Sequence, residues 1–164
     1  MNSERAFGIA QWLASNKPYE ANYRDSFTSR EFVEAWCVIS DEVDRIPVVG
    51  DAGLEQFLWH AGHLLGDSIW SEEIEEELAV QAVTASRSII VHCCVGTSPD
   101  WLGALMFWEN VLGGRVSGRR GDRLWAAAAA TLAALDRVDD PCVVESTRHG
   151  RQHFNRIETL WAAE

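Results

Sequence analysis

The sequence predicts an all-α protein of six or seven antiparallel helices, arranged as helical hairpins or as an irregular bundle, in a single domain over residues 1–164. Apolar residues recur at helical spacing along almost the whole chain, and turn-forming residues fall between the apolar runs. The chain is 164 residues long and 47% hydrophobic, which is sufficient for one buried core. Helix-start and helix-stop signals then place the individual elements.

The first two helices are marked at their ends. One is predicted over residues 3–15 and stops before Pro18. In the second, Thr28 is the predicted N-cap and Glu31 completes a capping box, so the helix begins there and stops before Pro47. The apolar positions of the two helices are Phe7, Ala10 and Leu13 in one and Phe32, Trp36, Ile39, Val43 and Ile46 in the other.

Two further helices are predicted in the middle of the chain. Asp51 is expected to cap the first, and Ser71 the second, because the glutamates after Ser71 are favoured near a helix N-terminus. The second is expected to end near Ser88, and residues 89–95 are interpreted as helical, with a short buried strand as the alternative. The apolar side of the first of these helices carries Leu54, Phe57, Leu58, Ala61, Leu64 and Leu65.

The last third of the chain contains three more helix signals. Ser98 and Pro99 predict a helix start, and the glycines at 113–114 predict its end. An alanine-rich helix is expected from Asp122 to about residue 138, where Asp139-Asp140-Pro141 breaks it. The final helix is predicted from Cys142 or Glu145 to Trp161. Its candidate buried positions are Val143, Val144, Phe154, Ile157 and Leu160.

The charge of the chain is concentrated in its first two thirds. Residues 1–114 hold 6 basic and 18 acidic side chains, a charge of −12, whereas residues 115–164 hold 8 and 7, a charge of +1. A net charge of −11 repels phosphate backbones and attracts cationic surfaces. We therefore expect no direct nucleic-acid binding. The local basic patch of Arg115, Arg119, Arg120 and Arg123 is interpreted as a flexible surface loop, because no phosphate-binding glycine pattern surrounds it.

The sequence indicates a soluble cytoplasmic protein with reduced cysteines. No apolar run approaches the ~20 residues of a membrane-spanning helix, and the first residues do not resemble a signal peptide. We therefore expect no membrane partner. The four cysteines, Cys37, Cys93, Cys94 and Cys142, have no C-x-x-C spacing and are expected to be reduced and mostly buried. A cysteine phosphatase is excluded, because Pro99 and Asp100 stand where its phosphate-binding arginine is required.

One dense carboxylate cluster is the candidate partner-binding surface. Like charges at helical spacing destabilise a helix by some tenths of a kcal/mol unless a dipole or a cationic partner offsets them. The cluster can therefore serve as a docking surface that mimics phosphates, or it can be a solvated first helical turn. Its predicted partner-binding residues are Asp67, Glu72, Glu73, Glu75, Glu76 and Glu77.

Two histidine pairs provide the alternative site. His60 and His63, like His149 and His153, lie one helical turn apart, as metal ligands require. Asp67 lies one turn beyond His63, and counting 100° per residue places it with both histidines opposite the apolar side of their helix, where they would face solvent or a second interface. This arrangement resembles the histidine-bearing bundles of DinB-like metal proteins, which implies a metal-dependent enzyme. Ordinary histidines on a polar face are the simpler interpretation, so no cofactor is predicted.

Residues 122–163 resemble the helical hairpins of HEAT-like repeat proteins. The resemblance lies in a small-residue helix, a polar Asp-Asp-Pro turn and a second helix with Glu145-Ser146 followed by His149-Gly150 and His153. It implies stacked antiparallel helices whose surface binds another macromolecule. Some bacterial HEAT-like proteins are immunity proteins or antitoxins. We therefore expect an acidic binding module that inhibits a cationic toxin or enzyme, with the metal-dependent enzyme as the alternative.

Overall fold

The computed structural model describes residues 1–15, 26–47, 50–99, 102–116 and 121–162. These residues form helices joined by turns, and none of them is in a β-strand. The prediction of an all-α fold is confirmed. None of the described helices is long and apolar enough to cross a membrane. The α-helices are α1 (Ser3–Ser15), α2 (Ser29–Asp41), α3 (Gly50–Ser68), α4 (Glu76–Cys94), α5 (Leu102–Gly113), α6 (Asp122–Leu135) and α7 (Pro141–Ala162), and the 3-10 turns are η2 (Val43–Arg45) and η3 (Gly114–Val116).

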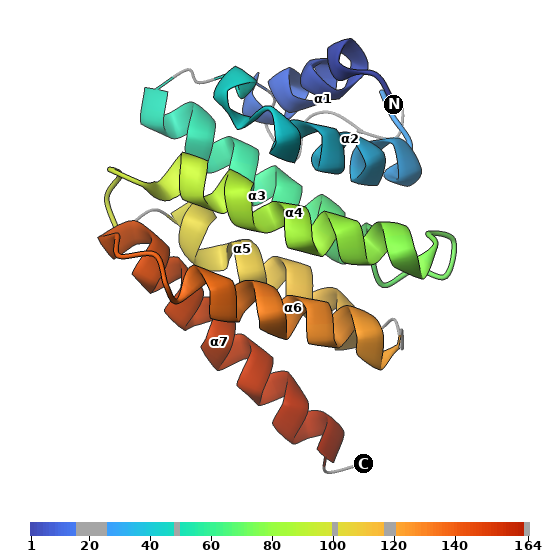
Figure 1. The fold of residues 1–164 in the computed structure, drawn as a ribbon, viewed down its shortest axis with the longest axis vertical. Helices are drawn as coiled ribbons and strands as arrows, with labels where there is room; N and C mark the ends of the chain where they lie inside the picture. The colour runs from blue at the N-terminus through green and yellow to red at the C-terminus, as the bar shows by residue number, and fades with distance from the viewer. Residues whose placement is uncertain (16–25, 48–49, 100–101, 117–120, 163–164) are drawn as a thin grey trace.

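The helices form two layers (Figure 1). In one layer α2, α4 and α6 lie side by side, and in the other α3 packs on α5 and α5 packs on α7. The hairpins α3–α4 and α5–α6 each place one helix in each layer, while α1 packs against α2 and α3 at one end of the stack. The buried apolar side chains of all seven helices form one continuous cluster between the layers.

Trp36 is the residue that joins the layers most directly. Its ring stacks on Phe57 of α3 at 5.8 Å and on Phe107 of α5 at 6.1 Å between ring centroids. Its indole N–H donates to the Ser86 hydroxyl of α4 at 3.0 Å. One fully buried side chain of α2 therefore contacts three other helices and leaves no unpaired polar atom.

Several predicted helix ends are confirmed. The limits of α1 agree with the sequence, and α2 begins with the expected capping box, in which the Thr28 hydroxyl accepts from the Glu31 N–H at 3.1 Å and the Glu31 carboxylate accepts from the Thr28 N–H at 2.7 Å. At the start of α7, Asp140 accepts from the N–H groups of Cys142 and Val143, and Pro141 occupies the first helical position. A helix end could be predicted from the local sequence where a side chain next to the helix caps it.

Other predicted helix ends were wrong. Ser71 does not cap α4, which begins five residues later at Glu76. Ile74 is only 2% exposed, so the chain between α3 and α4 turns inward to bury it, and the Ser71 hydroxyl accepts from the Glu73 N–H instead. Further along, α4 continues through the buried Ile89 and Ile90 to Cys94. The helical interpretation of this segment is therefore confirmed as far as Cys94, whereas the expected end near Ser88 and the strand alternative are wrong.

Smaller differences concern two helix ends and two side chains of α7. The helix α3 begins at Gly50, so Asp51 lies inside it, and α6 ends at Leu135 rather than near residue 138. The predicted start at Ser98 and Pro99 adjoins residues 100–101, which lie outside the described part of the chain. On α7, Val144 and Leu160 were predicted to be buried but are 46% and 56% exposed, because no described helix covers that side of α7.

Glycines set the spacing of the α3–α5–α7 layer. A Cβ atom at Gly66 would collide with the backbone carbonyl of Asn110 on α5, and one at Gly103 would collide with the carbonyl of Glu55 on α3. On α7, a Cβ at Gly150 would lie 2.7 Å from the Cβ of Trp108. These helices therefore approach one another more closely than any side chain at the three positions would allow.

The spacing can be tested by comparing two alanine substitutions. Gly66→Ala is expected to lower the free energy of unfolding by about 1–3 kcal/mol, because backbone rather than a flexible side chain must move. Gly8→Ala is the matched control, since Gly8 is exposed within α1 and a Cβ there meets nothing within 4 Å. It should raise the free energy by about 0.5–1 kcal/mol. Urea unfolding measures both, and a stabilised Gly66→Ala protein would contradict this packing.

Candidate functional site

The six predicted partner-binding carboxylates lie together around the connection between α3 and α4. We call this surface the acidic turn. Its first member is near the end of α3, two members lie in the turn itself, one is the N-cap of α4 and two are in the first turn of α4. In chain order these residues are Asp67, Glu72, Glu73, Glu75, Glu76 and Glu77.

Half of the acidic turn is paired with arginines of the neighbouring helices. Arg30 of α2 donates from Nη1 to both carboxylate oxygens of Glu75 at 2.7 Å, and this hydrogen-bonded pair raises the Arg30 pKa. Arg123 of α6 pairs with Glu77 at 2.6 Å and lies 3.9 Å from Glu76. These carboxylates connect α4 to both helices beside it, so they present less free charge than the sequence indicates.

The other half of the acidic turn is exposed. Asp67, Glu72 and Glu73 are solvent-exposed, and no basic side chain in the described part of the chain forms an ion pair with them. Among the described residues, three carboxylates without an ion-pair partner therefore remain at this end of the molecule. In a chain of net charge −11 their potential adds to that of the whole protein.

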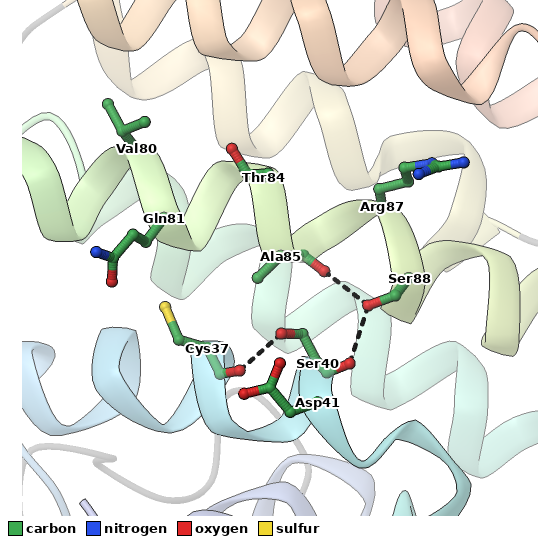
Figure 2. A pocket seen from close by; sticks show the side chains of 9 residues that line it. All are labelled: Cys37, Ser40, Asp41, Val80, Gln81, Thr84, Ala85, Arg87 and Ser88. Carbon is green, nitrogen blue, oxygen red and sulfur yellow. Dashed lines mark hydrogen bonds between the residues drawn. The ribbon is translucent and has the colours of Figure 1, made fainter.

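A groove runs between the last turn of α2 and the middle of α4 (Figure 2). Its volume is about 490 Å³, and we call it the α2–α4 groove. The two helices are joined across it, because the Ser88 hydroxyl donates to the Ser40 carbonyl at 3.2 Å. The lining residues are Cys37, Ser40, Asp41, Val80, Gln81, Thr84, Ala85, Arg87 and Ser88.

Small side chains account for the depth of the groove. At the facing positions of the two helices stand Ser40, Ala85 and Ser88, while the large Trp36 turns inward to the core. A second hollow of about 400 Å³ shares Arg87 and Ser88 with the groove and continues it along α4. The second hollow is lined by Val43, Arg87, Ser88, Val91, His92 and Val138.

The groove contains one acidic side chain, Asp41, that points into it and one basic side chain, Arg87, at its edge. Cys37 and Asp41 of α2 point into the space between the helices, as does Gln81 of α4, whereas Arg87 points away from Asp41 (Figure 2). Burial raises the pKa of the Cys37 thiol to about 11, and the carboxylates of Asp41 and Glu34 contribute to the same shift. Cys37 is therefore a neutral thiol near pH 7 and a poor nucleophile. The arrangement is suited to binding a side chain rather than to covalent catalysis.

His60 lies at a second helix interface, which is one of the two environments that the sequence left open for it. It is 5% exposed and lies between α3 and α1, with Nδ1 3.0 Å from the Leu13 carbonyl and 2.9 Å from the Gln56 carbonyl. Burial lowers its pKa, so the ring is neutral and its Nδ1–H donates to these carbonyls. His63 is exposed, which puts the two histidines of this pair in different environments.

The second histidine pair lies on α7. His149 and His153 are both half-buried, and burial lowers the pKa of His153. Within the described ranges no group of three or more histidine, cysteine, aspartate or glutamate side chains is arranged to hold a metal ion. The metal-dependent alternative therefore gains no ligand set from the described geometry.

Arg115 belongs to a stack of side chains that sequence reasoning missed. It was interpreted as part of a flexible surface loop, but it is only 6% exposed. Its guanidinium lies 4.2 Å from the ring centroids of both Trp125 and Trp161, and the other face of Trp125 stacks on Phe154 at 4.1 Å. This cation–π stack holds the end of α7 against α6, so Arg115 is a structural residue. In the sequence, the tryptophans of the following helices were the feature that could have indicated the burial of Arg115.

Comparisons with known proteins found no match. No family model matches the chain, and neither a curated protein nor a solved structure matches it. The charges of the acidic turn and the shape of the α2–α4 groove are therefore the observations on which a functional proposal rests.

The electrostatics of the groove can be tested through Cys37. Asp41→Asn removes a negative charge beside the thiol, so the Cys37 pKa should fall and its alkylation at pH 8 should accelerate by about two- to threefold. Asp139→Asn changes the net charge equally in the turn after α6 and should leave the rate unchanged. Iodoacetamide labelling followed by peptide mass spectrometry measures the rate at Cys37 alone. Equal rates in both variants would contradict the placement of Asp41.

Proposed function

We propose that this protein is an acidic helical binding module of the immunity or antitoxin type, which captures a cationic protein, a toxin or an enzyme. The observation that carries the proposal is the exposure of Asp67, Glu72 and Glu73, without described counter-ions, beside three carboxylates that are paired. The partner's lysines or arginines would occupy the exposed carboxylates. An apolar or uncharged side chain of the same partner would enter the α2–α4 groove.

Long-range electrostatics supports this function. Clustered charges of one sign accelerate the encounter with an oppositely charged surface and disfavour partners of the same sign. A net charge of −11 makes phosphate-bearing partners unfavourable and cationic proteins favourable. The paired carboxylates of the acidic turn contribute to the position of α4 rather than to free charge. Their bonds to Arg30 and Arg123 connect α4 to α2 and α6. The exposed carboxylates thus stand on a rigid support, which lowers the entropy lost on binding.

The arrangement of the helices also supports a binding role. Hairpins stacked so that each mainly contacts its neighbours are the architecture that the HEAT-like resemblance of residues 122–163 implies. In such stacks the surface of one helical layer serves as an extended binding face. Here that face would be the layer of α2, α4 and α6, which carries the groove.

Affinity purification with a matched pair of variants tests the proposal. The wild-type protein is expected to retain a basic protein from its native host at low salt and to release it at high salt, because the contact is electrostatic. Glu72→Gln with Glu73→Gln should weaken that complex about fivefold, equivalent to about 1 kcal/mol. Titration of the purified partner in increasing salt gives the affinities, and mass spectrometry identifies the partner.

The control changes the same amount of charge elsewhere. Glu4→Gln with Asp139→Asn also removes two exposed carboxylates, but from the start of α1 and the turn after α6. This variant should bind with nearly the wild-type affinity. Equal losses in the two double variants would show that net charge alone matters, and recovery of no basic protein at low salt would count against the binding function itself.

A further inference from the structure

A histidine is buried where the last turn of α1 packs on α3. His60 is 5% exposed, and its Nδ1 lies 3.0 Å from the Leu13 carbonyl of α1 and 2.9 Å from the Gln56 carbonyl of its own helix. Leu13 belongs to the last turn of α1, where carbonyl groups generally have no partner within the helix. His60 therefore supplies a hydrogen bond to the end of α1 and joins the two helices.

The hydrogen bonds determine which form of the imidazole fits the site. Both partners of Nδ1 are carbonyl oxygens, which can only accept, so the proton of the neutral ring is on Nδ1. Nε2 then carries a lone pair, and it is buried without a hydrogen-bond partner among the described residues. The Trp12 ring lies beside the imidazole, with 5.7 Å between the ring centroids. The site is therefore suited to a neutral histidine.

A second proton on the ring would have to bind at Nε2. The new N–H would be buried without an acceptor, and the ring would carry a charge where water has no access. The two carbonyls favour a charged ring, but burial opposes it more strongly, so the pKa of His60 is lower than that of an ordinary histidine. The geometry and the pKa thus agree that the closed interface excludes the charged ring.

The charged groups near the ring do not offset this cost. The last turn of α1 contains no charged side chain, and on α3 a positive charge at His63 would lower the His60 pKa further. No other charged group in the described part of the chain acts on the ring. The helix α2 packs against both α1 and α3, and its charged side chains are exposed or half-exposed. They are Arg30, Glu31, Glu34 and Asp41.

We propose that His60 is a pH-sensitive switch between α1 and α3, which is closed while the ring is neutral and opens when the ring gains a proton. The charged ring reaches water only if the last turn of α1 separates from α3. The start of α1 is held by other bonds, from the Ser3 hydroxyl to Glu42 at 2.7 Å and from Arg5 to the Ser26 carbonyl at 2.8 Å. Opening is therefore local to the second half of α1, and it does not depend on the proposed binding function.

The direction of the pH dependence follows from the binding of the proton. A histidine whose pKa is lower in the closed state than in the open state takes up its proton on opening, so acid favours the open state. The closed state is fully favoured above a pH of about 6.5, the ordinary histidine pKa, and is lost progressively as the pH falls below that value. One proton changes the opening equilibrium by up to about tenfold per pH unit.

Hydrogen exchange measured by mass spectrometry tests the switch in the whole chain. After correction for the intrinsic exchange rate, the protection of residues 9–15 should fall about tenfold between pH 7.5 and 5.5, whereas the protection of α4 should stay nearly constant. His60→Asn should remove this pH dependence, because an asparagine N–H can still donate to the carbonyls but cannot titrate in this range. Constant protection of α1 in the wild type, or an equal fall in α4, would overturn the proposal.

Two further variants and one direct measurement complete the test. His63→Gln and His153→Gln are the controls and should keep the pH dependence of α1, although burial also lowers the pKa of His153. If His60→Asn does not fold, nitrogen-15 NMR of the wild-type imidazole rings decides the question. His60 should carry its proton on Nδ1 at pH 7.5 and should gain the second proton only below pH 6.5, together with the loss of protection in α1. Protonation of His60 at or above pH 6.5, or without a change in α1, would contradict the switch.

Discussion

The close approach of α3, α5 and α7 through glycine is the constraint on which the rest of the structure depends. At Gly66 and Gly103 the backbones of α3 and α5 meet without a side chain between them, and at Gly150 the backbone of α7 lies on Trp108. With this layer fixed, the space above it has a definite depth, and Trp36 fills it by stacking on Phe57 and Phe107. The positions of α2 and α4 follow from that contact, so the groove between them is a consequence of the packing beneath it.

The same geometry brings three helix starts to one end of the molecule. The helices α2, α4 and α6 all begin there (Figure 1), and Arg30 and Arg123 are each the second residue of their helix. The N-terminal carboxylates of α4 therefore lie between two equivalent arginines. The Glu76 carboxylate also lies against Gly121, at the start of α6, where a negative charge is favoured by the helix macrodipole. Acidic residues that would otherwise destabilise the start of α4 become its connections to both neighbours.

Sequence reasoning succeeded where local chemistry decides the structure. The capping box of Thr28 and Glu31 involves four consecutive residues, so it was predicted. The start of α7 was expected at Cys142 or Glu145, and the structure places it at Pro141 with Asp140 as the cap. For His60 the count of 100° per residue left two alternatives, solvent or a second interface, and the structure shows the second, because α3 is covered by α5 on one side and α1 on another. Periodicity in a single helix carries no information about a second neighbour.

In the candidate site too, features set by neighbouring residues were predicted and features set by distant contacts were not. The acidic turn was found from composition, but its division into paired and exposed carboxylates depends on Arg30 and Arg123, which are distant in sequence. The α2–α4 groove could not be predicted, because it arises from small residues such as Ser40 and Ala85 on helices whose register is set by the core. The prediction that Arg115 lies in a flexible surface loop failed for a related reason. Its burial requires Trp125 and Trp161 to pack over it from two other helices.

The last helix is held by three different kinds of contact, which explains how it stays in place with one side uncovered. At its start Asp140 binds the turn after α4, in its middle Gly150 packs on Trp108, and near its end the Arg115 stack joins it to α6. The middle contact is apolar, and the stack keeps a buried cation between aromatic faces, with the Asp122 carboxylate 3.8 Å from the Arg115 guanidinium. The start is attached by hydrogen bonds, because the Asp140 carboxylate accepts from the Gly96 and Cys142 N–H groups beside a turn that is exposed at Val95 and Gly96.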